Sequence, residues 1–84
     1  MFNDSSALAL KALGWILADG SRAQRFLDLT GLTPDALRAA LDDAATHRAV
    51  FEYLAAYEPD LIACADALDV PPEEIARAGE ELRA

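Results

Sequence analysis

The sequence predicts an all-α protein in which residues 1–84 form a single domain, a compact bundle of about six short helices. Leucine and alanine dominate the composition and β-branched residues are scarce, so the propensity for strands is weak along the whole chain. Glycines and prolines also divide the chain into short segments, in which apolar residues recur at helical spacing. Helix is therefore the only regular structure that these observations favour.

Capping signals define the first three helices. Residues 3–6 supply the cap of the first helix, and Gly20 ends it. Ser21 is the expected cap of the second helix, and Gly31 is its expected left-handed terminator. Thr33 and Pro34 provide the cap and the first residue of the third helix. These three helices are predicted over about residues 5–19, 21–30 and 34–43.

Prolines delimit the helices of the second half. A fourth helix is predicted over about residues 47–57, and Pro59 opens a fifth that runs to about residue 68. Pro71 and Pro72 fix the entry of a sixth helix, whose first turn places Glu73 and Glu74 at the positive end of the helix dipole. All connections are short, as in antiparallel or corner-packed helices.

The two halves of the chain resemble each other weakly. A shift of 38 residues places Asp28 on Asp66 and Pro34 on Pro72, with helices, turn and proline in the same order. Small proteins made of amphipathic helices share such an order by chance as well. The sequence therefore leaves open both a duplicated three-helix unit and a chance likeness.

Helical spacing also predicts which residues are buried. The corner between the second and third helices is expected to pack its leucines together. The predicted core includes Leu29, Leu32, Leu37, Phe51, Leu54 and Ile75.

The first helix is apolar on two sides. At about 100° per residue, one stripe comprises Leu10, Leu13, Ile16 and Leu17. Leu8 and Trp15 lie nearly opposite that stripe. The helix is therefore either buried between neighbours or presents a patch centred on Trp15 to a partner or to a second copy.

The corner at Gly31 has the shape of a DNA-reading helix-turn-helix but lacks its charge. Positions 1–41 hold four basic and four acidic residues, whereas positions 42–84 hold three basic and eleven acidic ones. The net charge of −8 therefore lies entirely in the second half. Because binding to phosphates needs lysine and arginine, we expect no nucleic acid partner, and we interpret the corner as a packing element.

The sequence offers no candidate catalytic, cofactor-binding or metal-binding residue. Cys64 lies on an apolar helical stretch without a base nearby, so a buried, unreactive thiol is expected. His47 has none of the ligand spacings of zinc sites and is expected near the surface, at the start of the fourth helix. Adjacent acids such as Asp42 and Asp43 point in different directions on a helix and cannot share a proton. We therefore expect no enzyme and no cofactor.

Two stretches carry a resemblance to a known family: "ALGW" in the first helix and the corner "FLDLTGLTPDALR". With them, the chain resembles a bacterial domain-of-unknown-function family of short, acidic, all-helical proteins. The resemblance extends over nearly the whole chain. It implies a small helical bacterial protein without an assigned activity, and it supplies no functional residues.

The first residues of the chain do not have the pattern of a targeting segment. Asp4 precedes the apolar run of the first helix, and Lys11 interrupts it, so we expect neither a signal peptide nor a membrane span. A single cysteine agrees with a reducing compartment. The expected location is the cytoplasm.

These observations favour a non-catalytic protein-protein interaction or adaptor module. It is expected to be a monomer or a homodimer. Its partner is an unknown protein, and a protein with a basic surface is one option. The candidate interaction residues are Leu8, Trp15, Glu73, Glu74, Glu80 and Glu81. The acidic second half is either a solvated face or a docking face; its acids include Glu58, Asp60, Asp66, Asp69, Glu73, Glu74, Glu80 and Glu81. The alternatives are a small ligand-binding protein or enzyme without a recognisable motif, and an acidic decoy of a nucleic-acid-binding protein.

Overall fold

The computed structural model describes residues 4–83, and within this range every regular element is an α-helix. The helices are α1 (Asp4–Leu17), α2 (Gly20–Thr30), α3 (Pro34–Ala39), α4 (Ala44–Ala56), α5 (Glu58–Leu68) and α6 (Pro72–Arg83). The predicted class and the predicted six helices are confirmed. No helix in this range combines the length and the apolar character needed to cross a bilayer.

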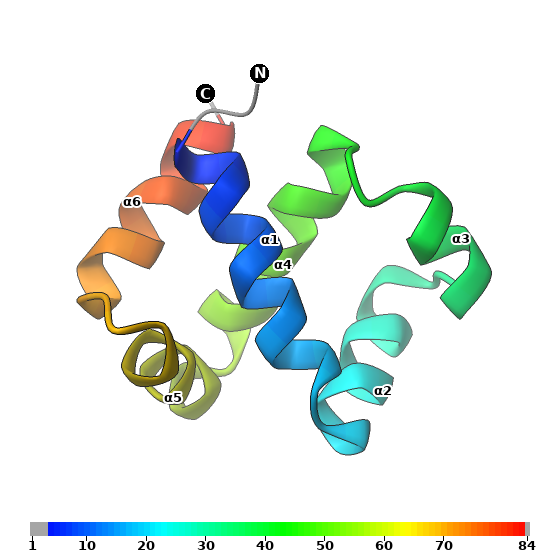
Figure 1. Cartoon of the computed structure of the whole chain (residues 1–84), viewed down its shortest axis with the longest axis horizontal. Coiled ribbons are helices and arrows are strands. Elements are labelled where there is room, and N and C mark those ends of the chain that lie inside the picture. The colour runs from blue at the N-terminus through cyan, green and yellow to red at the C-terminus, as the bar shows by residue number, and fades with distance from the viewer. Residues whose placement is uncertain (1–3, 84) are drawn as a thin grey trace.

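Helices α1, α4 and α6 pack against one another and form the centre of the bundle (Figure 1). Helix α2 covers α1 and α4 on one side, whereas α5 packs against all three central helices. Helix α3 lies at the edge of the molecule beyond α2 and makes few contacts with other helices. The beginning of α1 lies beside the end of α6, so these two helices run antiparallel.

Two local signals fix the corner between α2 and α3 as predicted. Gly31 adopts the left-handed conformation with φ 74°, and its N–H donates to the carbonyl of Leu27 at 2.8 Å. The Thr33 hydroxyl accepts a hydrogen bond from the N–H of Ala36 at 3.1 Å, and Pro34 occupies the first helical position. The corner is therefore built by the caps that its sequence supplies.

Other helix boundaries differ from the prediction. Asp19, and not Ser21, caps α2, because its carboxylate accepts from the N–H of Arg22 at 3.0 Å and makes Gly20 the first helical residue. The cap expected within residues 3–6 would fall on residue 3, outside the described residues, since Asp4 is already helical. Helix α3 ends at Ala39, earlier than expected, and α4 therefore begins ahead of the predicted start.

The core confirms most of the predicted buried residues and corrects one. Leu37, Phe51, Leu54 and Ile75 are buried, and Leu32 is partly buried against the core. The prediction for Leu29 was wrong, because its side chain is 51% exposed. Helix α2 turns the side of Arg22, Ala23, Phe26, Leu27 and Thr30 inward, which leaves Leu29 on the outer side.

Small residues let α1 approach its neighbours. Its buried residues are Ser5, Ala9, Ala12, Leu13 and Ile16, so only half of the predicted leucine-rich stripe is buried. Leu17 is exposed, and Leu10 is partly exposed. The inward side of α1 is thus set by alanines, which fill little volume and allow close helix packing.

The two halves of the chain share part of their arrangement. Helix α2 packs on α1 as α5 packs on α4, and each of α2 and α5 also contacts the first helix of the other half. The third helices differ, because α6 packs against α1, α4 and α5, whereas α3 lies at the edge. The correspondence therefore extends to the first two helices of each half.

Leu37→Ala should lower the free energy of unfolding by about 2–4 kcal/mol, because Leu37 is the only buried residue of α3 within the described chain and truncation leaves a cavity. Leu29→Ala is the matched control, and we expect its effect to stay within about 0.5 kcal/mol. Urea unfolding followed by circular dichroism measures both. Equal losses for the two variants would contradict the placement of the corner.

Candidate functional site

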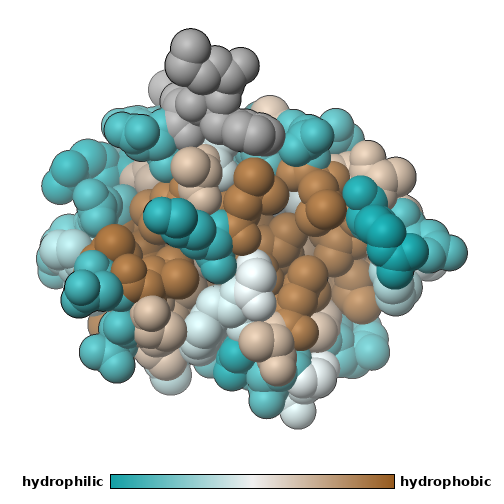
Figure 2. All heavy atoms as spheres, viewed as in Figure 1, coloured by the Kyte–Doolittle hydropathy of each residue, from teal (hydrophilic) through white to brown (hydrophobic). Residues whose placement is uncertain are grey.

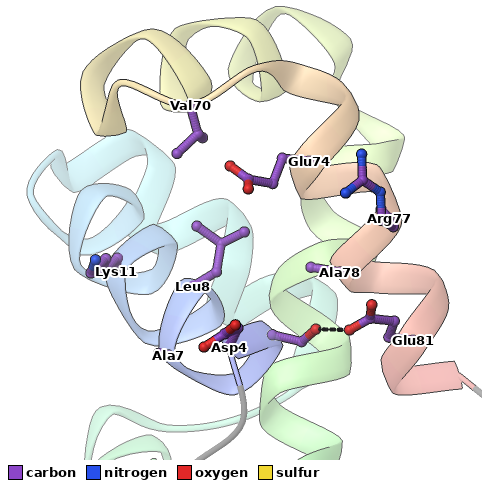
Figure 3. A pocket seen from close by; sticks show the side chains of 10 residues that line it. Asp4, Ala7, Leu8, Lys11, Val70, Glu74, Arg77, Ala78 and Glu81 are labelled. Atoms are coloured by element: carbon purple, nitrogen blue, oxygen red, sulfur yellow. Dashed lines mark hydrogen bonds between the residues drawn. The ribbon is translucent and has the colours of Figure 1, made fainter.

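A groove of about 380 Å³ runs between α1 and α6 (Figure 3). On α1 it is lined by Asp4, Ser5, Ala7, Leu8 and Lys11, and on α6 by Glu74, Arg77, Ala78 and Glu81. Val70, in the turn before α6, completes the lining. The two helices supply both walls because they lie side by side in opposite directions.

The groove has a small, apolar middle between charged ends. Leu8 and Val70 point toward each other in Figure 3, with Ala78 on the facing helix. At one end the buried Ser5 hydroxyl donates a hydrogen bond to a carboxylate oxygen of Glu81, which ties the start of α1 to the end of α6. This bond fixes the relative position of the two walls.

The charged residues of the groove face solvent. Asp4, Lys11, Glu74, Arg77 and Glu81 are all exposed, and none of them forms an ion pair with another residue in the described range. Their charges are thus available to a binding partner without breaking an internal salt bridge.

The structure brings three of the six predicted interaction residues together in this groove, namely Leu8, Glu74 and Glu81. Glu73 is exposed on α6 but does not line the groove. Glu80 lies on the rim of a second, smaller pocket of about 150 Å³ between α4, α5 and α6. The acids of α6 are therefore divided between the groove, the second pocket and the open surface.

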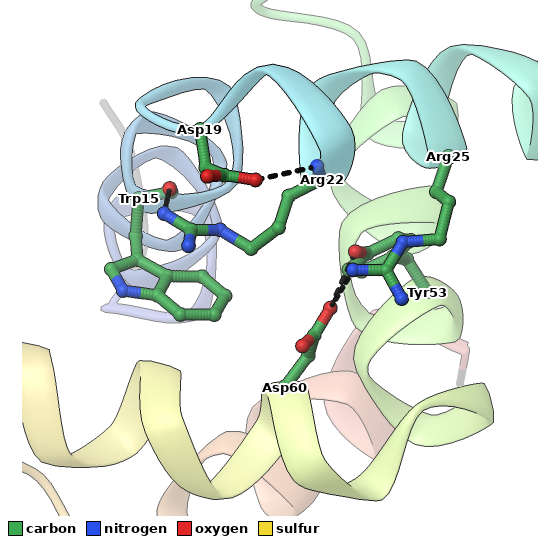
Figure 4. Close-up of polar contacts among 6 residues, drawn as sticks. All are labelled: Trp15, Asp19, Arg22, Arg25, Tyr53 and Asp60. Atoms are coloured by element: carbon green, nitrogen blue, oxygen red, sulfur yellow. Dashed lines mark hydrogen bonds and ion pairs between the residues drawn. The ribbon is translucent and has the colours of Figure 1, made fainter.

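Trp15 lies apart from this groove. It is partly buried, and the guanidinium carbon of Arg22 lies 3.8 Å from the centre of its ring (Figure 4). The same guanidinium donates a hydrogen bond to the Trp15 carbonyl oxygen at 2.6 Å. Trp15 shares a side of α1 with Leu8, but Arg22 of its own chain already covers it.

Apolar residues gather in two places on the face of the molecule drawn in Figure 2. Figure 2 shows a smaller apolar cluster toward α6 and α5 and a larger one toward α2 and α3. Hydrophilic residues surround both clusters on this face. The groove between α1 and α6 lies on the same side of α1 as the smaller cluster.

A second polar cluster joins α2, α4 and α5. The buried Tyr53 donates its phenolic hydrogen to Asp60 at 2.5 Å, and Arg25 lies 3.4 Å from the same carboxylate oxygen (Figure 4). The Asp60 side chain is only 17% exposed, so its predicted place on an exposed acidic face, whether solvated or docking, was wrong. This carboxylate is instead an internal acceptor that links three helices.

Burial, followed by the hydrogen bond to Asp60, raises the pKa of Tyr53 to about 12. Burial also raises the pKa of the Cys64 thiol to about 11. Cys64 is fully buried, which confirms the predicted packing role for this side chain. Both groups therefore stay protonated at neutral pH.

The position predicted for His47 was wrong. Its side chain is only 2% exposed, and Nε2 lies 2.7 Å from the carbonyl oxygen of Leu41. Because α4 begins at Ala44, His47 lies inside the helix and shares the buried side of Val50 and Phe51. In the described range, no group of three or more His, Cys, Asp and Glu residues is arranged to hold a metal ion.

Sequence reasoning missed several residues of the groove, including Asp4, Lys11 and Arg77. Their signal is the spacing of the charges along each helix: Asp4 and Lys11 lie seven positions apart on α1, and Arg77 lies three positions after Glu74 and four before Glu81 on α6. That spacing does not reveal which two helices face each other, because the contact between α1 and α6 joins the two ends of the chain.

Comparison with known proteins gives one match. A family model described as "Protein of unknown function (DUF3572)" matches residues 3–84. No curated protein and no solved structure matches the chain.

The raised pKa of Tyr53 predicts a loss of stability at alkaline pH. The unfolded phenol ionises near pH 10, whereas the folded one keeps its proton until about pH 12. Stability from this group is therefore complete below pH 10 and is lost as the pH rises from 10 to 12. In Tyr53→Phe this part of the pH dependence should disappear, as measured by urea unfolding at several pH values. If the free energy of unfolding fell equally in both proteins between pH 10 and 12, the prediction would be contradicted.

Proposed function

The chain belongs to the DUF3572 family, a family of proteins of unknown function, and we propose that it is a non-catalytic module that binds another protein through the groove between α1 and α6. The observation that carries this proposal is the apolar middle around Leu8, bordered by exposed charges without internal ion pairs in the described range. Protein interfaces have this composition, with an apolar centre and a polar rim.

The partner surface that we propose is basic. Glu73, Glu74, Glu80 and Glu81 are exposed on α6, and the net charge of the chain is −8. A positive partner is attracted to such a surface mainly through a faster association rate, and the attraction weakens with added salt. Glu81 lies at the Ser5 end of the groove, where Asp4 adds a further negative charge.

The alternatives lead to different ligands in the same place. A groove of about 380 Å³ lies at the lower end of the range for small-molecule sites, which supports a few side chains of a protein as the occupant. An acidic decoy would be one form of the proposed module, with a nucleic-acid-binding protein as the basic partner. The single cysteine supports a reducing compartment, and we propose the cytoplasm.

A photo-crosslinking residue in place of Lys11 should capture the partner in the native cell, because Lys11 is exposed and lines the groove. The matched control places the same residue at the exposed Leu29 on α2, remote from α6. We expect a discrete product at position 11 that is absent at position 29. Gel electrophoresis of the irradiated cells, with an antibody against a tag, measures both.

Reversal of the α6 acids that do not bond to Ser5 provides the second arm of this experiment. In a protein with Glu73, Glu74 and Glu80 changed to lysine and Glu81 to glutamine, which keeps an oxygen for the Ser5 hydroxyl, the product at position 11 should be lost while circular dichroism stays helical. The same product at both positions, or an unchanged yield after the reversal, would refute the proposal.

A further inference from the structure

We infer that the segment held in the groove is a short amphipathic helix of the partner, with apolar residues over Leu8 and Ala78 and a lysine or arginine at the end formed by Asp4 and Glu81. This inference rests on the proposed function. It adds that the bound segment is helical, that one of its faces is apolar, and that its cationic end lies beside Asp4 and Glu81.

The spacing of the lining residues supports a helical occupant. Along α1 the groove is lined at positions 4, 5, 7, 8 and 11, and along α6 at positions 74, 77, 78 and 81. Both sets include the pattern i, i+3, i+4, i+7, which marks one face of a helix over two turns, and Ser5 adds one position on α1. Two antiparallel helices that present such faces form a groove, and the side-chain ridge of a third helix can pack into it.

An extended occupant finds no comparable site. A bound strand adds to a sheet edge through backbone hydrogen bonds, and the described range contains helices but no strand. Between the end turns of α1 and α6, the backbone N–H and C=O groups are used within each helix. Recognition in the groove therefore depends on side chains, as in helix-in-groove complexes.

The middle of the groove determines that the bound helix has an apolar face. Ala7 and Ala78 are small and leave room in the groove. Leu8 and Val70 are apolar and partly buried, so the groove can accept apolar side chains of another helix. Two turns of helix span about 10 Å, so the contact needs only two or three turns of the partner.

The two ends of the groove differ in charge. This difference determines at which end the cation of the bound helix lies. Asp4 and Glu81 lie at the end where Ser5 bonds to α6, and both are acidic. The other charged lining residues are Glu74 and the cations Arg77 and Lys11. A cation of the bound helix therefore gains most beside Asp4 and Glu81, and a helix with the opposite orientation places it near Lys11.

The test uses a synthetic helical peptide of about 15 residues, long enough for the two or three turns of contact, held by a lactam bridge, with two leucines four positions apart and two lysines at one end. Titration into ¹⁵N-labelled protein should shift the amides of α1 and of α6 along the groove and leave those of α3 unchanged. A peptide of the same composition with one leucine moved to the opposite side, and a peptide with glutamate in place of lysine, should both bind at least about tenfold more weakly.

Protein variants locate the binding within the groove. Asp4→Asn with Glu81→Gln should weaken binding of the lysine peptide about threefold to tenfold, and the amide introduced by Glu81→Gln keeps an oxygen that Ser5 can bond. Asp28→Asn with Asp42→Asn removes the same charge from exposed acids elsewhere and should leave binding unchanged. Leu8→Glu should abolish binding. Equal affinity for the three peptides, or amide shifts centred outside α1 and α6, would overturn the inference.

The crosslink at position 11 separates this inference from the proposed function. Mass spectrometry of the crosslinked product identifies the captured segment of the partner. A segment with the predicted amphipathic pattern and a terminal cation supports the inference. A captured segment that is broken by proline, or that is acidic, overturns the helical occupant while the interaction function stands, and a missing product overturns both.

Discussion

The close approach of α6 to α4 at Gly79 governs the position of the groove. A Cβ atom placed on Gly79 would lie only 3.1 Å from the Cβ of Phe51, so the two helices meet at a distance that a larger residue does not fit without a shift. The contact between α4 and α6 is the most extensive in the bundle. Ala9 and Ala12 give α1 a similarly small inward side. Helix α1 also packs against α4, and Ser5 joins the two walls of the groove through Glu81.

The pairing of the charges explains why an acidic excess is exposed on one side. In the first half of the chain, Arg22 covers Trp15, Arg25 pairs with Asp60 and Arg38 pairs with Asp35. Three of the four cations of that half are therefore engaged within the protein. The acids of α6 have no ion-pair partner within residues 4–83, so their charges stay unneutralised by internal salt bridges, while Lys11 and Arg77 line the same groove.

Local signals in the sequence were sufficient for the fold class, for the corner at Gly31 and for most of the core. They fail where the outcome depends on how a helix is rotated in the bundle. Leu29 lies on an amphipathic segment but faces outward, and His47 is buried because α4 starts earlier than its residues suggest. For the site, the charges and Leu8 were identifiable, but the pairing of the first helix with the last was not, since no local pattern encodes a contact between chain ends.

The most direct test of this account compares two helical glycines. Gly14 in α1 is exposed, and a Cβ there would meet nothing within 4 Å, so Gly14→Ala should raise the free energy of unfolding by about 0.5–1 kcal/mol through helix propensity alone. At Gly79 the same gain is opposed by the contact with Phe51. Urea unfolding should show that Gly79→Ala gains nothing or loses stability relative to the unchanged protein. A gain at Gly79 as large as that at Gly14 would contradict the close approach on which the position of α6, and with it the groove, depends.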